Sequence, residues 1–331
     1  MRALQTNRLL FLRKFTRKSF LLACVVLISF AKSVVAKDDA PVLLPAPKKI
    51  SPHVYAWIGP LDGPSKKNQG YRMNMAFVVG DNAVAVLETG YTEAMAEAML
   101  KHIRHITHKP IKAAINCNSQ PDRFMGNPAF RRAGIKIIAH AESAKRMAKQ
   151  SANYASNIER ILELKAGSIK IPKAPDILIT GKHVIELGGV NVILDNYGPA
   201  HTPAQLVAYI AQDHVVYSGD LLYGQRLLAI NTDGSVSSWI SNFDRLKQID
   251  AKIFIPGHGQ PGPLSEFEFS TRQYLALLYD HMTKMLDSGV DMQDAINRLN
   301  QSAFSKLANF ELLAGRNASR TYLEVEAAAF N

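Results

Sequence analysis

Residues 115–127 read INCNSQPDRFMGN, and this turn organises the rest of the chain. A short apolar run precedes it and a helical pattern follows it. A turn between the end of a strand and the start of a helix is where α/β proteins usually bind their ligands. If the chain stays extended here, Asn118, Gln120 and Asp122 point to one side and predict a metal or substrate site. A polar turn with an Asx cap on the next helix explains the same stretch equally well.

The composition is that of an ordinary globular protein. The chain has 331 residues, 47% hydrophobic and 20% charged, which suffices for one domain with additions or for two. A net charge of +11 by itself suggests a nucleic-acid or membrane partner. Seven of the 39 basic residues, however, precede Lys37, where no acidic residue occurs. The remainder is only mildly basic, so we expect no nucleic-acid partner.

The first 36 residues have the pattern of an export signal. A basic stretch ends at Lys18, an apolar stretch spans 20–30, and Val34-Val35-Ala36 predicts cleavage after Ala36. The apolar stretch is too short to span a bilayer comfortably, so we expect no membrane anchor after cleavage. Cys117 is then the only cysteine left, which excludes a disulfide and a cysteine-based zinc site. The sequence predicts a periplasmic or secreted protein.

The rest of the chain divides into a linker, a domain and a helical extension. Residues 37–52 are proline-rich and are expected to form the linker. Within the predicted domain, 53–263, strand and helix patterns occur twice, and each half begins with a hairpin, at 75–87 and at 182–197. Two mixed α/β halves packed sheet against sheet, with helices outside, cover both apolar faces. Residues 264–331 are mostly amphipathic helix, expected to pack on the domain.

Capping residues and prolines predict where the helices begin and end. Thr92 is expected to cap a helix that runs to about His105, before Pro110. Ser238 is expected to cap a helix that runs through Ile249. The segment 151–171 is also helix-like.

Four side chains able to bind a metal follow predicted strands. Asp122 lies in the opening turn, and His201 lies in the loop GPAHTP, where two prolines exclude a helix. Asp220 ends an apolar strand, and His258 stands between two glycines that let a backbone approach closely. For each histidine alone a structural role is the simpler interpretation. Two imidazoles and two carboxylates in matching contexts nevertheless favour a shared zinc or iron site.

These motifs resemble those of the metallo-β-lactamase superfamily over about residues 52–262. The matching stretches are Val79-Gly80-Asp81, Leu87-Glu88-Thr89-Gly90, Ile115-Asn116, Gly198–Pro203, Gly219–Tyr223 and Pro256-Gly257-His258-Gly259. The resemblance implies an α/β fold, an αβ/βα four-layer sandwich of two pseudo-symmetric halves, here with a helical C-terminal extension. It also implies a metal-dependent hydrolase.

The chain departs from the family in the first metal motif. The family's His-x-His-x-Asp-His stands here as Asn118-x-Gln120-x-Asp122-Arg123. The later family ligands are present as His201, Asp220 and His258. By resemblance, one metal position loses two histidines to amides, which bind zinc weakly. The other position keeps Asp122, Asp220 and His258, enough for one ion with open coordination positions.

Three interpretations of this degenerate motif remain open. In the first, one zinc or iron ion held by Asp122, Asp220 and His258, with His201 beside it, activates a water molecule. Asp122 and His201 are then the catalytic residues, and Asn118, Gln120 and Arg123 orient an ester, amide, thioester or similar small molecule. In the second, Arg123 pairs with Asp122 and replaces the metal, which leaves a non-catalytic relative that binds a small molecule or a protein partner. The third is a dinuclear enzyme of the β-lactamase kind. The sequence carries no signature of the substrate or of the oligomeric state.

Overall fold

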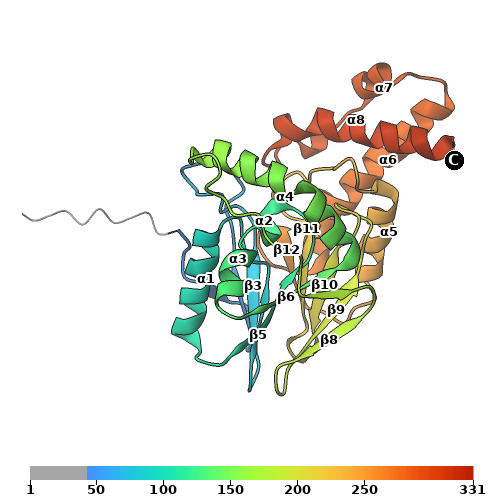
Figure 1. Cartoon of the computed structure of the whole chain (residues 1–331). Coiled ribbons are helices and arrows are strands. Elements are labelled where there is room, and N and C mark those ends of the chain that lie inside the picture. The colour runs from blue at the N-terminus through green and yellow to red at the C-terminus, as the bar shows by residue number, and fades with distance from the viewer. Residues whose placement is uncertain (1–42, 331) are drawn as a thin grey trace, which may run out of the picture. The chain divides into compact units, whose positions relative to one another are not determined.

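The computed structural model describes residues 43–330, which lie within one compact unit. Two sheets form its centre (Figure 1). The first has the strand order β1-β2-β3-β4-β5-β6-β7, with β1 Lys48–Lys49, β2 Val54–Trp57, β3 Met75–Val79, β4 Val84–Leu87, β5 Ile111–Asn116, β6 Lys136–His140 and β7 Ile177–Ile179. The second has the order β12-β11-β10-β9-β8, with β8 His183–Glu186, β9 Asn191–Asn196, β10 Leu206–Ile210, β11 Val215–Tyr223 and β12 Ile253–His258. The predicted export signal lies outside the described residues.

Turn chemistry and crossover helices explain the pairing of the strands. β3 and β4 are antiparallel across the predicted turn, with Val79 opposite Val84. β8 and β9 are joined at Gly188 and Gly189, whose φ values of 81° and 65° suit glycine and strain other residues. β4, β5, β6 and β7 run parallel, because helical connections carry the chain back between them. Parallel strands end at one edge, so the loops after them gather at one end of the molecule.

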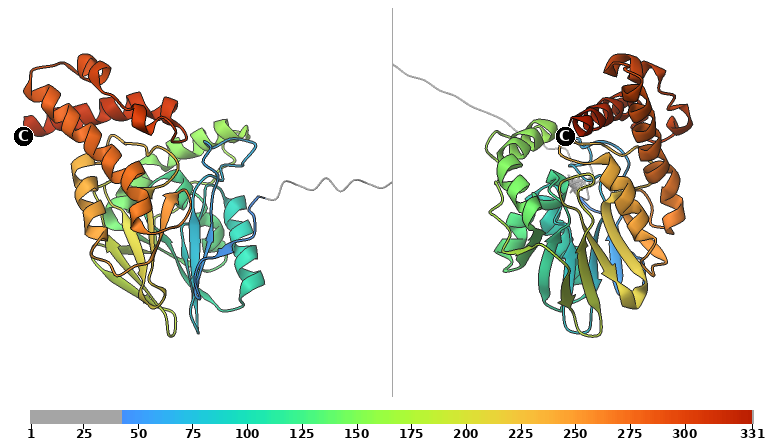
Figure 2. Two further views of the ribbon diagram at one scale, coloured as in Figure 1. Left: turned by 180° about the vertical axis from the view of Figure 1, so that it is seen from behind. Right: turned by 90° about the vertical axis from the view of Figure 1, so that its right-hand side faces the viewer.

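Helices cover the outer face of each sheet (Figures 1 and 2). On the side of the first sheet lie α1 Glu93–Ile106, α2 Pro121–Phe124, α3 Asn127–Arg132 and α4 Ala141–Leu162. On the side of the second lie α5 Val236–Leu246, α6 Tyr274–Asp287, α7 Met292–Arg298 and α8 Phe310–Ala329. The short helical turns are η1 Ala211–Asp213, η2 Leu264–Phe267, η3 Glu268–Gln273 and η4 Ser302–Phe304. Separate apolar clusters fill the space between the sheets and the space under each helical layer. The predicted αβ/βα sandwich with a helical C-terminal extension is confirmed.

The C-terminal extension shares its apolar core with the second sheet. Leu278 of α6 and Ala318 of α8 belong to the same buried cluster as Leu221 and Trp239. A carboxylate fixes α8 to α5, because Glu324 accepts hydrogen bonds from the backbone N–H groups of residues 236 and 237 at 2.7 and 3.2 Å. α8 lies beyond the end of the sheets that is opposite the β3–β4 and β8–β9 turns (Figure 1). It therefore covers the end of the sandwich at which the parallel strands terminate.

Several local predictions need correction. The predicted helix-like segment 151–171 is too long, because α4 ends at Leu162, where Glu163 adopts the left-handed region at φ 55°. Residues 163–171 are not helical. α5 is capped by Ser235, three residues before the predicted Ser238. The described part of the predicted linker contains β1, which pairs with β2.

Thr92 caps α1 as predicted, accepting from the N–H of Met95 at 3.2 Å. Within residues 43–330 the structure contains no helix with the length and apolarity that crossing a bilayer requires.

Candidate ligand-binding site

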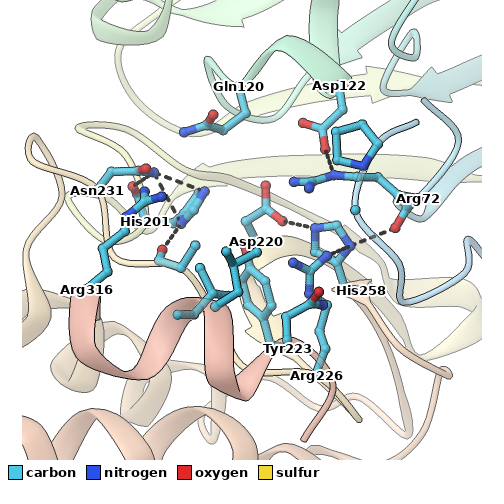
Figure 3. A pocket seen from close by; sticks show the side chains of 16 residues that line it. Arg72, Gln120, Asp122, His201, Asp220, Tyr223, Arg226, Asn231, His258 and Arg316 are labelled. Atoms are coloured by element: carbon cyan, nitrogen blue, oxygen red, sulfur yellow. Dashed lines mark hydrogen bonds and ion pairs between the residues drawn. The ribbon is translucent and has the colours of Figure 1, made fainter. Parts of the chain in front are cut away.

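A cavity of about 220 Å³ lies at the covered end of the sandwich (Figure 3). Its wall comes from both sheets, from the loop before β3 and from α8. Five of the predicted site residues line it: Gln120, Asp122, His201, Asp220 and His258. Residues more than one hundred positions apart in the chain thus meet in one place, as the strand-end pattern predicts.

Arg123 is a buried cation behind the wall of this cavity. Its side chain is 0% exposed, and its Nε and Nη2 donate to the two carboxylate oxygens of Asp220 at 3.0 and 2.5 Å. Its Nη1 donates to the carbonyl of Asn74 at 3.0 Å. Burial opposes the ionisation of Asp220, but the charge of Arg123 outweighs burial and holds the Asp220 pKa well below its usual value. The bidentate geometry is the strongest that a guanidinium and a carboxylate can adopt.

Asn118 completes the set of donors around Asp220. Its Nδ2 donates to Asp220 at 2.7 Å and to Gln205 at 3.0 Å, and its Oδ1 accepts from the N–H of Gln120 at 2.8 Å. Asn118 and Arg123 are both fully buried, and neither belongs to the cavity wall. Their predicted contact with a substrate is therefore corrected, because they hold Asp220 in place instead. Pro121 begins α2 within the turn, so the expected extended alternation of Asn118, Gln120 and Asp122 is interrupted as well.

Asp122 is balanced by two arginines. The Nε of Arg72 donates to one carboxylate oxygen at 3.3 Å (Figure 3). The Nε of Arg123 lies 3.7 Å from the other oxygen. The predicted pair of Arg123 and Asp122 is therefore present as an ion pair, but the bidentate hydrogen bonds of Arg123 go to Asp220. Each carboxylate oxygen of Asp122 thus faces a guanidinium group, which argues against the predicted catalytic role of Asp122.

Both histidines of the site are buried and neutral at pH 7. The Nδ1 of His201 lies 2.8 Å from the carbonyl of Ala229 and donates to it, so Nε2 keeps its lone pair. Burial lowers the pKa of His201, despite the nearby carboxylate of Asp220. The Nδ1 of His258 donates to the carbonyl of Arg72 at 2.8 Å. Burial and the charge of Arg226 lower the pKa of His258 well below its usual value.

The sequence profile of the metallo-beta-lactamase superfamily matches residues 70–258, more than half of the chain. The chain belongs to the metallo-beta-lactamase superfamily. Solved members show the same fold. A metallo-beta-lactamase from Pontibacter korlensis has a TM-score of 0.57 at 21% identity, covering 70% of this chain and 98% of that one. A stereoselective inverting sec-alkylsulfatase from Pseudomonas sp. has a TM-score of 0.61 at 16% identity, covering 84% and 49%. At these identities the likeness shows the fold alone.

The curated relatives that match the chain are distant. A linear primary-alkylsulfatase from Pseudomonas sp. is 20% identical over 250 residues, which are 65% of this chain and 47% of that protein. The alpha subunit of a 2,4-dinitroanisole O-demethylase from Nocardioides sp. is 22% identical over 193 residues, 58% of this chain and 54% of that protein. The chain thus spans about half the length of these relatives.

Members of the metallo-beta-lactamase superfamily usually bind metal ions, but the residues present here do not fit one. A metal at Asp122, Asp220 and His258 needs carboxylate oxygens of Asp220 that Arg123 and Asn118 already bind. It would also face the fixed positive charge of Arg123, which lies 3.5 Å from the Nε2 of His258. Within residues 43–330 no group of three or more His, Cys, Asp or Glu side chains is arranged to hold a metal. The geometry of these side chains therefore does not fit the predicted zinc or iron site at Asp122, Asp220, His258 and His201.

Three arginines of the cavity wall escape the sequence analysis: Arg72, Arg226 and Arg316. Arg226 follows β11 and is only 4% exposed, while Arg316 comes from α8. One feature of the sequence could have indicated Arg226 as a site residue. It is a charged residue between apolar ones, shortly after the family motif that ends at Tyr223 and just before Leu227 and Leu228. No pattern in the sequence connects Arg72 or Arg316 with that stretch.

Proposed function

We propose that this chain is a metal-independent member of the superfamily that binds a small molecule in the cavity. One observation carries the proposal: the bidentate pair of Arg123 and Asp220 in a fully buried position. A guanidinium stays protonated in proteins, so Arg123 supplies a permanent positive charge where the sequence predicts the metal. The cavity itself remains open beside this pair, lined by polar side chains that can orient a ligand.

The metal content of the purified protein tests this proposal. Protein purified without chelators is expected to contain far less than one zinc or iron per chain, and added zinc should not raise its melting temperature. Stoichiometric metal that is lost in Asp220→Ala would overturn the proposal. The matched gain-of-function variant is Asn118→His/Gln120→His/Arg123→His, which rebuilds the family motif and removes the guanidinium. This triple variant is expected to acquire zinc, which shows that the assay can detect a site in this fold.

Hydrolysis without a metal is a second candidate, favoured by the geometry of His201. Its Nε2 carries a lone pair, and the Nδ2 of Asn231 lies 3.2 Å away at the cavity wall. A neutral imidazole in this position can act as a general base toward a water molecule. Turnover of 4-nitrophenyl hexanoate in the presence of EDTA, abolished in His201→Gln, would support this candidate. Turnover that needs added metal, or that persists in His201→Gln, would reject it.

We also propose that the protein acts outside the cytoplasm. The supporting observation is the basic and apolar pattern of residues 1–36, followed by small residues. Fractionation of cells that express the full chain, with N-terminal sequencing of the product, tests the expected cleavage after Ala36. A small-molecule ligand, rather than nucleic acid, is the partner we expect there.

A further inference from the structure

Arg226 is a buried cation without a counterion. Its side chain lines the cavity and is 4% exposed, and its Nε has no hydrogen-bond partner. No carboxylate among residues 43–330 lies within ion-pair distance of it. Its Nη1 lies 3.3 Å from the Nδ1 of His258, but that nitrogen already donates its proton to the carbonyl of Arg72. Two donors therefore face each other, and neither satisfies the guanidinium of Arg226.

Burying a charge without a partner is strongly unfavourable, so proteins rarely keep one. Burial and the charge of nearby Arg72 both lower the pKa of Arg226, which is the expected sign of this unfavourable environment. An unpaired, desolvated guanidinium at a cavity wall can form strong charge-assisted hydrogen bonds to a ligand that supplies the missing negative charge. Figure 3 shows Arg226 and Arg72 on the same side of the cavity, next to the ring of His258.

The charges around the cavity do not cancel. Four arginines lie in its wall or directly behind it: Arg72, Arg123, Arg226 and Arg316. Only two carboxylates, Asp122 and Asp220, face them. Burial raises the pKa of nearby Glu88 to about 8, so at pH 7 this group is mostly uncharged. The described site thus has an excess of about two positive charges, which an anionic ligand would neutralise.

Part of the cavity wall is apolar. Leu312 and Leu313 of α8 line the cavity together with Pro64 and the ring of Tyr223. Leu312 is 73% exposed, which is unusual for a leucine beside a cavity and leaves apolar area available to a ligand. A ligand that satisfies both parts of the wall has a charged head and a short hydrocarbon arm.

We propose that the cavity binds a small organic anion with its oxyanion head, a carboxylate, sulfate or phosphate group, between Arg226 and Arg72 and its apolar part along Leu312 and Leu313. This inference rests on the proposed function and names the ligand class of the same site. The anion makes charge-assisted hydrogen bonds to Nη–H groups of Arg226. No covalent step is involved.

Isothermal titration calorimetry with four probes tests the inference: hexyl sulfate, hexanoate, hexan-1-ol and inorganic sulfate, at one fixed ionic strength. Hexyl sulfate and hexanoate are expected to bind at least tenfold more tightly than hexan-1-ol, which lacks the charge. They are also expected to bind at least tenfold more tightly than inorganic sulfate, which lacks the apolar arm. Equal affinity for hexyl sulfate and hexan-1-ol would reject the claim that the site selects an anion. Equal affinity for hexyl sulfate and inorganic sulfate would reject the claim that an apolar arm contributes to binding.

Two variants locate the binding. Arg226→Met keeps the volume of the side chain and removes the unpaired charge, so it should fold with unchanged or higher melting temperature and bind hexyl sulfate at least tenfold more weakly. The control Arg298→Met removes an exposed arginine of α7, far from the cavity wall, and should leave binding unchanged. Leu312→Asp adds a negative charge at an exposed position and should weaken binding at least fivefold, whether or not Arg226→Met folds. Wild-type affinity in Arg226→Met or in Leu312→Asp overturns the assignment.

The inference and the proposed function fail in different ways. Tight binding of hexan-1-ol that is lost in Tyr223→Ala would agree with the proposed small-molecule site. It would reject only the inference that the ligand is an anion. Stoichiometric zinc bound through Asp220 would instead overturn the metal-independent site. Absence of heat with all four probes overturns the inference, while the metal analysis still decides the other proposal.

Discussion

Replacing Arg123 by methionine removes the cation on which the proposed metal-independent site depends. The variant leaves the carboxylate of Asp220, whose side chain is 2% exposed, with Asn118 as its remaining strong donor. Breaking a buried ion pair by removing one partner is expected to lower the free energy of unfolding by about 3–5 kcal/mol. Much of this loss comes from the buried charge that stays behind, so a second substitution that neutralises Asp220 should recover part of it. We expect Arg123→Met/Asp220→Asn to be more stable than the sum of the two single changes predicts, by about 2 kcal/mol.

Urea unfolding of the wild type, both single variants and the double variant at pH 7.5 measures these free energies. The pH dependence gives a second readout. The folded-state pKa of Asp220 lies below the unfolded value of about 3.9, so this group stabilises the wild type above that value and ceases to do so as the pH falls through the folded pKa. Without Arg123, burial raises the pKa of Asp220 instead, and the carboxyl is protonated more readily. The deficit of Arg123→Met should therefore shrink between pH 7.5 and pH 5.

The exposed arginine Arg298, which pairs with Asp294 along α7, provides the control. Arg298→Met is expected to change the free energy of unfolding by less than about 1 kcal/mol, because surface ion pairs contribute little. The reasoning is refuted if Arg123→Met lies within about 1 kcal/mol of the wild type, or if the losses of the single variants simply add in the double variant.

Two further predictions concern other buried or capping carboxyls. Burial raises the pKa of Glu88 to about 8 from an unfolded value near 4.5, so the wild type should lose stability as the pH rises from 5 to 8. Glu88→Gln should remove this loss, up to about 1.4 kcal/mol per pH unit, and parallel stability profiles of the two proteins would contradict the assignment. Glu324 accepts from two N–H groups at the start of α5, so Glu324→Ala should destabilise the protein by about 1–2 kcal/mol in urea unfolding. The adjacent exposed change Leu323→Ala serves as the comparison, and equal effects would show that the cap contributes nothing specific.

The local sequence determines the fold of this protein. Alternating apolar residues, the turn at Gly80-Asp81-Asn82 and the positive-φ pair Gly188-Gly189 place the hairpins, and Thr92 begins α1 where its side chain can cap the helix. These signals act over a few residues, so they can be interpreted without knowledge of the tertiary structure. The family motifs at strand ends similarly bring Gln120, Asp122, His201, Asp220 and His258 to one cavity.

Only the tertiary structure decides the chemistry of the site. The sequence shows that Arg123 stands at a ligand position of the family, but not whether its guanidinium reaches Asp122 or Asp220. That choice depends on distances of a few ångströms between separate elements, and on Asn118 and Asn74 supplying the remaining hydrogen bonds. Arg226 is still less accessible to sequence analysis, because an arginine in a loop is normally solvated or paired. Its lack of a counterion becomes visible only when Arg72 and His258 pack beside it, since whether a charge is satisfied is a property of the whole surroundings and not of the residue.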